Sequence, residues 1–377
     1  MATADIVVVG GGIAGASTAA FAAESGARVL LLEREPVLSW HTTGRSAALY
    51  LANYGPAQIR RLTLASRSFL ASPPDGFTDV PLLSARGMIW VGGAGDGAAL
   101  RELERAGRAL DPDVCALTGD EVLRMCPVLR RDHAEWGVCE PGAADIDVAA
   151  LHAGFVRRLR ACGGATVTAA AVASVQRRGS GWTVATHTGP VHCGILVNAA
   201  GAWGDEVAMI AGVRPLGLRP LRRTAATVAL PAGLNARAWP AVIHAGNAWY
   251  FKPEGDGLLV SPSDETPSAP MDARPQDLDV ALALERVAAA TTLPLRSARA
   301  AWAGLRTFAP DGELVVGADG DAPGFVWCVG QGGYGIQSSP AVGRLTADLA
   351  TGADTAWATG SGVDIAALGP DRLRGAR

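Results

Sequence analysis

The first 35 residues restrict the possible folds of this 377-residue chain more than any other segment. Residues 5–9 are a short β-branched apolar run, as a buried parallel strand requires. A glycine-rich turn follows, then small and apolar residues as far as Ser25, and then a second apolar run over residues 28–32. This order predicts a strand, a helix and a second parallel strand, which together form the β-α-β unit of dinucleotide-binding proteins.

Three glycines and one acidic residue in this unit have the spacing of the dinucleotide fingerprint. Gly10 permits the tight turn, Gly12 lets the backbone approach a pyrophosphate, and Gly15 lets the helix pack closely on the strand. Glu33 ends the second strand, where its carboxylate can accept hydrogen bonds from both ribose hydroxyls. A carboxylate there would repel a 2′-phosphate, so NADP is disfavoured, but the motif alone does not choose between NAD and FAD.

Composition and charge exclude several other classes of protein. The 33 basic and 36 acidic residues give a formal net charge of −3, which argues against nucleic acid as a partner because phosphate binding needs a basic patch. No stretch reaches the roughly 18 consecutive apolar residues of a membrane span. The six cysteines form no CxxC pair and have no zinc-ligand spacing. We therefore expect a cytoplasmic protein with reduced thiols and no metal site.

Three later segments have the features of a second set of cofactor contacts. Residues 43–46 read Thr-Gly-Arg-Ser and would supply hydroxyl and N–H groups for phosphate and ribityl oxygens. Residues 195–201 predict a strand that ends in small residues and can pass close to a cofactor. Residues 325–337 predict a strand, a glycine turn and the start of a helix that runs to about Thr351. The N-terminus of that helix would face negative charge.

Together with Glu33-Arg34, these segments resemble the D-amino acid oxidase superfamily of FAD-dependent oxidoreductases, over nearly the whole chain. The resemblance implies FAD as the cofactor, with no covalent link, although some related amine dehydrogenases attach flavin to the histidine of a Trp-His-x-x-Gly run such as residues 40–44. The cofactor contacts it implies, the fingerprint included, are Gly10, Gly12, Ile13, Ala14, Gly15, Glu33, Arg34, Thr43, Gly44, Arg45, Ser46, Ala48, Val172, Ala200, Gly201, Trp203, Arg306, Gly332, Gly333, Tyr334, Gly335, Ile336 and Gln337.

Ungapped shared runs make the chain most similar to the bacterial FAD-dependent D-arginine dehydrogenases; they are residues 44–48, 127–132, 142–147, 213–217, 302–306 and 331–337. A substrate with a carboxylate suits arginine, whose planar fork grips two oxygens. By resemblance, Arg223 and Arg306 hold that carboxylate, although Arg222 is an adjacent competitor. Tyr54 and Tyr250 match phenols that cover it, and the carbonyl of Gly333 matches an acceptor for the substrate amine.

Three positions depart from the D-arginine dehydrogenase pattern. A histidine, a threonine and a glutamate that accommodate a cationic side chain are replaced by Leu49, Leu51 and Met88. A buried cation without a partner would cost several kcal/mol. We therefore predict a pocket for apolar D-amino acids, with Trp249 adding apolar wall and Gln337 beside the flavin; in the alternative reading, Leu49 and Met88 belong to the core and the pocket lies elsewhere.

The sequence as a whole predicts an α/β fold, with a doubly wound Rossmann-type FAD-binding domain interleaved with a smaller mixed-sheet α+β substrate domain. Residues 1–55, 146–217 and 300–377 are assigned to the first domain, and residues 56–145 and 218–299 to the second. The expected activity is oxidative deamination of D-amino acids, with a preference for apolar side chains, to imino acids and then to 2-oxo acids and ammonia, with O2 or a quinone- or dye-like acceptor taking the electrons. A secondary-amine oxidase or dehydrogenase for sarcosine- or proline-like substrates, a 2-hydroxy acid dehydrogenase and a non-catalytic flavin-binding subunit are the alternatives.

Overall fold

The β-α-β unit at the N-terminus forms the centre of the larger helix-covered sheet in the computed structural model, which describes residues 2–375. Its parallel strands run in the order β9-β2-β1-β12-β20, with antiparallel strands at the edges. The strands of this first sheet are β1 (Ala2–Val9), β2 (Val29–Leu32), β9 (Ala165–Val167), β10 (Ser174–Arg178), β11 (Gly181–Thr186), β12 (Gly189–Asn198), β19 (Val315–Ala318) and β20 (Phe325–Val329). The predicted Rossmann-type fold is confirmed.

Both faces of this first sheet are buried, which explains the continuous apolar run in β1. Ile6 and Val8 belong to a core shared with three long helices, whereas Val7 and Val9 belong to a core on the opposite face. The helices of the first face are α1 (Ile13–Glu24), α5 (Val148–Ala161) and α8 (Gly335–Thr351). The short helix α6 (Gly204–Ile210) covers part of the other face. No helix within residues 2–375 is long and apolar enough to span a membrane.

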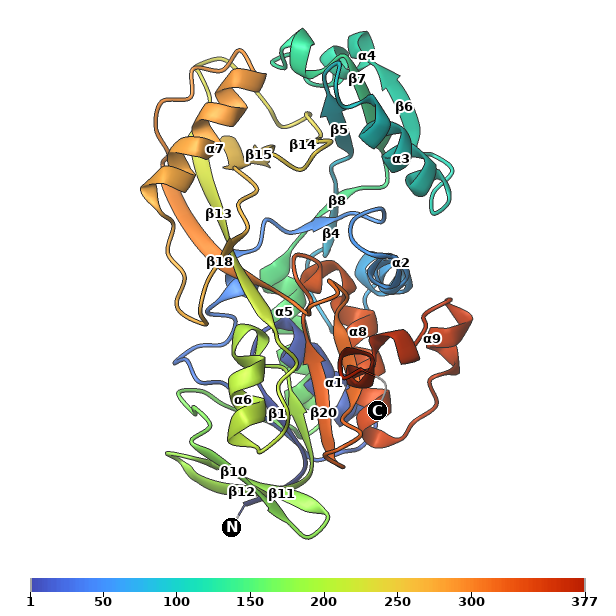
Figure 1. Cartoon of the computed structure of the whole chain (residues 1–377), viewed down its shortest axis with the longest axis vertical. Coiled ribbons are helices and arrows are strands. Elements are labelled where there is room, and N and C mark those ends of the chain that lie inside the picture. The colour runs from blue at the N-terminus through green and yellow to red at the C-terminus, as the bar shows by residue number, and fades with distance from the viewer. Residues whose placement is uncertain (1, 376–377) are drawn as a thin grey trace.

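A second, mostly antiparallel sheet forms the other lobe of the molecule, above the first sheet in Figure 1. Its strands are β5 (Met88–Gly92), β6 (Cys115–Thr118), β7 (Trp136–Glu140), β13 (Arg219–Ala229), β14 (Ala241–His244), β15 (Tyr250–Glu254), β16 (Gly257–Ser261), β17 (Thr266–Pro267) and β18 (Ala300–Phe308). A hairpin turn at residues 255–256 joins β15 to β16. One face packs against α7 (Asp277–Ala290).

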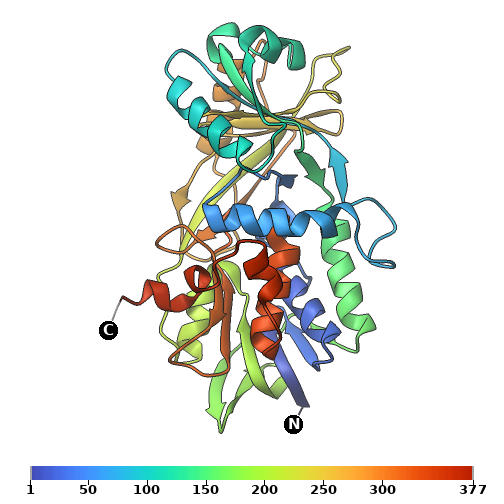
Figure 2. The ribbon, with the colours of Figure 1, turned by 90° about the vertical axis from the view of Figure 1, so that its right-hand side faces the viewer.

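Shorter elements connect the two lobes. A three-stranded sheet contains β3 (Leu49–Tyr50), β4 (Leu83–Ala85) and β8 (Ala144–Ile146). Helix α2 (Ala57–Ala71) lies across the middle of the molecule in Figure 2 and packs against α8. The remaining helices are α3 (Gly97–Arg108), α4 (Gly119–Met125), α9 (Ala356–Gly360) and the 3-10 turns η1 (Thr42–Arg45), η2 (Arg131–His133), η3 (Gly201–Trp203), η4 (Ala366–Leu368) and η5 (Pro370–Leu373).

Two details differ from the expectations. β18 lies in the second sheet, paired along its whole length with β13, so the change of sheet comes after Phe308 and not at residue 300. Residues 262–276 are largely exposed, as their composition predicts, but they are anchored to the fold. β17 pairs with β13, and the carbonyl of the buried residue Ala273 accepts a hydrogen bond from Arg45 Nη1 over 2.7 Å.

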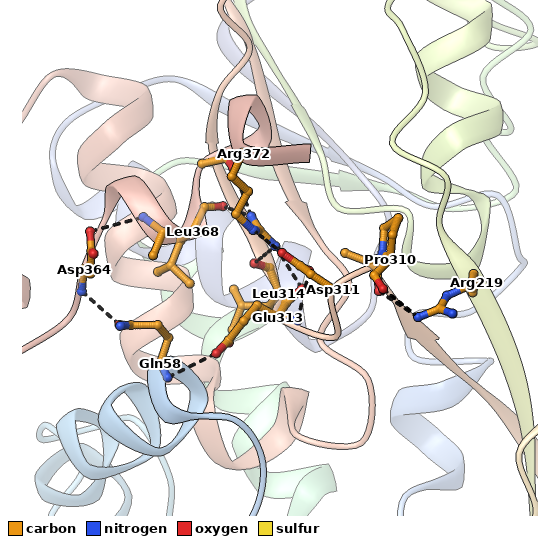
Figure 3. A network of polar contacts seen from close by, with 12 residues as sticks. Gln58, Arg219, Pro310, Asp311, Glu313, Leu314, Asp364, Leu368 and Arg372 are labelled. Atoms are coloured by element: carbon orange, nitrogen blue, oxygen red, sulfur yellow. Dashed lines mark hydrogen bonds and ion pairs between the residues drawn. The ribbon is translucent and has the colours of Figure 1, made fainter. Parts of the chain in front are cut away.

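A polar network joins the first turn of α2 to the C-terminal segment (Figure 3). The backbone N–H of Gln58 donates to Glu313 Oε1 over 3.4 Å, and the Gln58 side chain accepts from the backbone N–H of Asp364 over 2.9 Å. Arg372 Nε donates to Asp311 Oδ2 over 2.7 Å. Asp364 and the segment around Glu313 therefore hold the start of α2 in place. This start lies next to the loop that contains Tyr54.

The tight crossing of α1 and α8 gives a stability prediction. A Cβ atom at Gly343 would lie 2.4 Å from Ser17 Oγ and 2.8 Å from the Ser17 backbone carbon. Gly343→Ala should therefore lower the free energy of unfolding by about 1–3 kcal/mol, as overpacking does, when measured by urea denaturation. Gly360→Ala is the matched control, since nothing lies within 4 Å of that Cβ position. Equal stabilities for the two variants would contradict the crossing described here.

Candidate active site

The glycine-rich turn after β1 is held by close backbone contacts that admit no side chain. Gly10 has a φ of +112°, and a Cβ there would lie 2.4 Å from the carbonyl oxygen of Ala199. A Cβ at Gly15 would lie 1.9 Å from the carbonyl oxygen of Gly10. Thr43 Oγ1 accepts the backbone N–H of Ile13 over 3.0 Å at the start of α1. The turn thus presents the N-terminus of α1 to a cavity, as anion binding requires.

Glu33 is buried beside this turn, with only 7% of its surface exposed. Its Oε2 accepts the backbone N–H of Gly11 over 2.7 Å, and its Oε1 accepts the N–H of Glu35 over 2.9 Å. The carboxylate lines the cavity while it stabilises the turn. It can accept hydrogen bonds from a ribose only through lone pairs that these two N–H groups leave free.

One cavity of about 390 Å³ runs from the glycine turn to the second sheet, a volume within the usual range for ligand sites. Most of the predicted contacts line it: Gly10, Gly12, Ile13, Ala14, Glu33, Arg34, Thr43, Arg45, Ser46, Val172, Ala200, Gly201, Trp203, Arg223, Tyr250, Arg306, Gly332, Gly333, Gly335 and Ile336. The N-termini of α1 and α8 both open into this cavity, so two positive helix ends face the same space.

Some predicted cofactor contacts lie behind the wall of the cavity. Gly15 and Gly44 serve close backbone contacts, since a Cβ at Gly44 would lie 2.5 Å from the carbonyl oxygen of Ser39. Ala48 has a φ of +49° and belongs to a bend, and the ring of Tyr334 packs edge-on against Tyr54 with centroids 4.9 Å apart. Gln337 is buried, and its side chain bonds to the backbone of Leu51. These residues do not line the cavity, but they hold in place the segments that do.

Strand register brings the predicted substrate residues to one face of the second sheet. β13 and β18 pair antiparallel, with Arg223 opposite Gly304 and Leu221 opposite Arg306. Arg223 and Arg306 are therefore diagonal neighbours on one face, because partners across a ladder share a face. Gly304 adds no side chain between them. Tyr250, on β15, lines the same cavity.

The adjacent competitor, Arg222, points to the other face of the sheet. Its Nη2 donates to Asp279 Oδ2 on α7 over 2.9 Å. Successive side chains of a strand alternate between the two faces, so Arg222 and Arg223 cannot both reach the cavity. Of the two, Arg223 lines the cavity.

Arg306, which lines the cavity, is paired with Tyr54, and both residues are partly buried. Arg306 Nη1 donates to the Tyr54 hydroxyl over 3.1 Å. Burial raises the pKa of Tyr54, but the positive charges of Arg306 and Arg223 outweigh it and hold that pKa below its usual value. A Cβ at Gly333 would lie 2.7 Å from Arg306 Cζ, so a side chain at this position would displace the guanidinium.

Arg223 is 6% exposed and only partly hydrogen-bonded. Its Nε donates to the carbonyl oxygen of Asp264 over 2.7 Å, and its Nη2 pairs with Glu265 Oε1 at 2.8 Å. Its Nη1 is buried with no hydrogen-bond partner. Burial and the positive charge of Arg306 lower the pKa of Arg223. An anion placed between the two guanidiniums would satisfy the free donor and relieve their repulsion.

Leu49, Leu51 and Met88 are the apolar residues that replace polar residues of the D-arginine dehydrogenase pattern. All three belong to one hydrophobic cluster. Leu51 and Met88 are buried with Trp90 and Tyr250, and Leu49 packs against them. None of the three lines the cavity itself, but Tyr250 and Ala225, which belong to the same cluster, do.

The prediction that Trp249 adds wall to this pocket is wrong. Trp249 precedes Tyr250 on the chain and packs on the opposite face of the sheet, stacked on Phe251 with ring centroids 6.0 Å apart. Alternation along β15 separates the two side chains.

Sequence reasoning missed several residues of the site. His41 lines the cavity, its ring 4.5 Å from that of Trp203, and its Nε2 lies 3.0 Å from Glu35 Oε1. The Trp-His-x-x-Gly run was a signal for this position. No sequence pattern pointed to Glu265, because it belongs to a loop that is brought to Arg223 only by the folding of the chain.

Two glycine turns, a buried acidic residue and a pair of arginines around one elongated cavity define a dinucleotide-binding oxidoreductase. The family model described as "FAD dependent oxidoreductase" matches residues 5–349, and the chain belongs to this family. Its cofactor is therefore FAD. The glycine turn, Glu33 and the N-termini of α1 and α8 fit a long anionic dinucleotide that ends beside Arg306.

Individual relatives agree with this assignment. The chain is 28% identical over 399 residues to FAD-dependent oxidoreductase domain-containing protein 1 of Bos taurus, covering 92% of this chain and 80% of the relative. It is 25% identical to glycine oxidase of Geobacillus kaustophilus, covering 94% of both chains. The crystal structure of that oxidase superimposes with a TM-score of 0.85 over 98% of each chain. L-proline dehydrogenase from P. horikoshii shares the fold, with 18% identity, a TM-score of 0.83 and coverage of 99% of this chain and 98% of that one.

The double role of Glu33 gives a prediction for cofactor binding. Glu33→Gln keeps the size of the side chain but replaces one acceptor oxygen by an N–H donor, which would face the N–H of Gly11 or of Glu35. FAD affinity should fall by roughly tenfold, because a charge-assisted hydrogen bond contributes about 1.5–3 kcal/mol. The measurement is a titration of the apoprotein with FAD followed by flavin fluorescence. Glu104→Gln, in a partly exposed pair with Arg108 on α3, is the control and should bind FAD as the native protein does.

Proposed function

We propose that this protein catalyses the FAD-dependent oxidative deamination of D-amino acids with apolar side chains, giving imino acids. One observation carries the proposal: Arg223 and Arg306 lie on one face of the second sheet at the end of the cofactor cavity, with a free buried donor on Arg223. A non-catalytic flavin subunit would have no use for two guanidiniums that line this cavity.

Each residue has a role in holding the substrate. Arg306 and the free Nη1 of Arg223 bind the carboxylate, and the hydroxyls of Tyr54 and Tyr250 hydrogen-bond to it. The backbone carbonyl of Gly333 accepts a hydrogen bond from the amine. Together these contacts fix the orientation of Cα, and such positioning can contribute several kcal/mol to the rate.

Ala225 and Tyr250, the members of the apolar cluster that line the cavity, favour an apolar substrate side chain. Burial of such a side chain stabilises the complex by about 25 cal/mol per Å². A guanidinium or ammonium group would find the neighbouring carboxylates already engaged. Glu265 is paired with Arg223, and Glu140 is buried and accepts a hydrogen bond from Trp90 Nε1 over 2.8 Å. A buried cation left without a partner is strongly disfavoured.

The bound flavin supplies the two-electron oxidation by accepting a hydride from the substrate. The substrate amine must be neutral when the hydride leaves, so the rate should rise as the pH increases through the pKa of the bound amine. The imino acid then hydrolyses in water to a 2-oxo acid and ammonia. We assign no catalytic base, since hydride transfer requires none.

A panel of amino acids tests the substrate class directly. Anaerobic mixing with D-leucine, D-methionine or D-phenylalanine should bleach the bound flavin, and kcat/KM for D-leucine should exceed that for D-arginine by at least about tenfold, the equivalent of 1.4 kcal/mol. L-leucine is the control for chirality. The same panel with oxygen uptake recorded distinguishes an oxidase from a dehydrogenase.

Three results would contradict this proposal. Faster turnover of D-arginine than of D-leucine would contradict the apolar pocket. Bleaching by sarcosine or proline but by no primary D-amino acid would indicate a secondary-amine substrate. No bleaching by any amine would indicate another reaction.

The lowered pKa of Tyr54 gives a second prediction, on pH dependence. A phenol is neutral below its pKa and anionic above it, so carboxylate affinity should be retained at low pH and lost as the pH rises through this pKa, which lies below the ordinary value of about 10. In Tyr54→Phe, affinity at neutral pH should drop by up to about tenfold, the contribution of one hydrogen bond. The alkaline loss should also disappear. KM measured from pH 6 to about 10 checks both effects, and an unchanged alkaline loss in the variant would assign the titration to another group.

A further inference from the structure

Arg223 divides its hydrogen-bond donors between the cavity and a loop that closes over the edge of the second sheet. Nε and Nη2 are held by the Asp264 carbonyl and by Glu265 Oε1, at 2.7 and 2.8 Å. The remaining nitrogen, Nη1, is buried and has no partner. The guanidinium is therefore fixed from one side and offers one donor to a ligand.

Glu265 is held in place by backbone contacts on both sides of it. The carboxylate of Asp264 accepts the Thr224 N–H over 2.6 Å and the Thr224 hydroxyl over 3.0 Å. The next two residues form β17, which pairs with Leu221 and Arg222 of β13. This anchoring keeps Glu265 beside Arg223, although 49% of its side chain is exposed.

The charges at this end of the cavity are two guanidiniums and one carboxylate. Within residues 2–375, Glu265 supplies the one carboxylate that pairs with either Arg223 or Arg306. Asp264 is engaged with the backbone and side chain of Thr224. Arg223 and Arg306 together form the carboxylate clamp. After Arg223 pairs with Glu265, the clamp is left with one net positive charge, which a single substrate carboxylate neutralises.

We propose that Glu265 sets the charge of the substrate: it neutralises Arg223, so that the clamp accepts one carboxylate and rejects dicarboxylates. This inference rests on the carboxylate clamp of the proposed function and adds a limit on the substrate class. A second carboxylate would meet either Glu265, at the cost of like-charge repulsion, or the apolar wall that Ala225 and Tyr250 contribute to the cavity, at the cost of desolvation. Specificity for a monocarboxylate thus depends on repulsion by Glu265 as well as on attraction by Arg223 and Arg306.

Anion binding to the FAD-loaded protein tests the role of Glu265 without any turnover. Propionate and malonate are similar in length and carry one and two carboxylates. Each is titrated into the holoenzyme at constant ionic strength, with Kd read from the perturbation of the flavin absorbance spectrum. The native protein should bind propionate more tightly than malonate. In Glu265→Gln, the ratio of the two Kd values should shift toward malonate by about tenfold or more.

Two further variants complete the test. Glu265→Asp retains the charge and should keep the native preference for propionate. Glu102→Gln removes an exposed carboxylate, paired with Arg105 on α3, and is the control for the same change in net charge. It should leave the ratio unchanged.

The outcomes separate this inference from the function it rests on. If Glu265→Gln changes both affinities by the same factor, or if Glu102→Gln shifts the ratio equally, the role of Glu265 is overturned while the clamp stands. If the native protein binds neither anion, the clamp itself is wrong and both proposals fail.

Discussion

The antiparallel pairing of β13 with β18 is the interaction on which the active site depends. It extends over nine residue pairs, and the two strands run from the second sheet toward the lobe of the first sheet (Figure 1). The register of this ladder places two guanidiniums diagonally on one face, with a glycine opposite one of them. A shift of one strand by one residue would place the two arginines on opposite faces of the sheet. The substrate clamp is thus a property of strand register as much as of the side chains themselves.

Much of the fold could be predicted from the sequence because its signals are local. The spacing of Gly15 and Glu33 reflects close contacts within one β-α-β unit: Gly15 passes the carbonyl oxygen of Gly10, and Glu33 accepts the N–H of Gly11. The glycine turn before α8 is similarly local. It was harder to predict where along the chain the second sheet ends. β18 belongs to that sheet because it pairs with β13, which lies about 80 residues earlier in the chain.

The site was less predictable, for physical reasons that differ between residues. Which of Arg222 and Arg223 points into the cavity depends on which face of β13 is turned toward it. The pairing of β13 with β18 sets that orientation. The error at Trp249 could have been avoided, since adjacent residues of a strand point to opposite faces and Tyr250 had already been assigned to the pocket. Glu265 lies in a polar loop without a periodic pattern, and its distance from Arg223 is a result of tertiary structure alone.

The two glycine turns that enclose the cofactor lie near opposite ends of the chain, one before α1 and one before α8. β20 completes the parallel centre of the first sheet, and α8 packs on α1. Contacts between segments so distant in sequence form late and slowly. On the ribosome, a growing chain has the first turn long before the second, so it lacks a complete flavin site until residues of α8 have emerged. Capture of the cofactor is then an event that follows synthesis of the whole segment from β1 to α8.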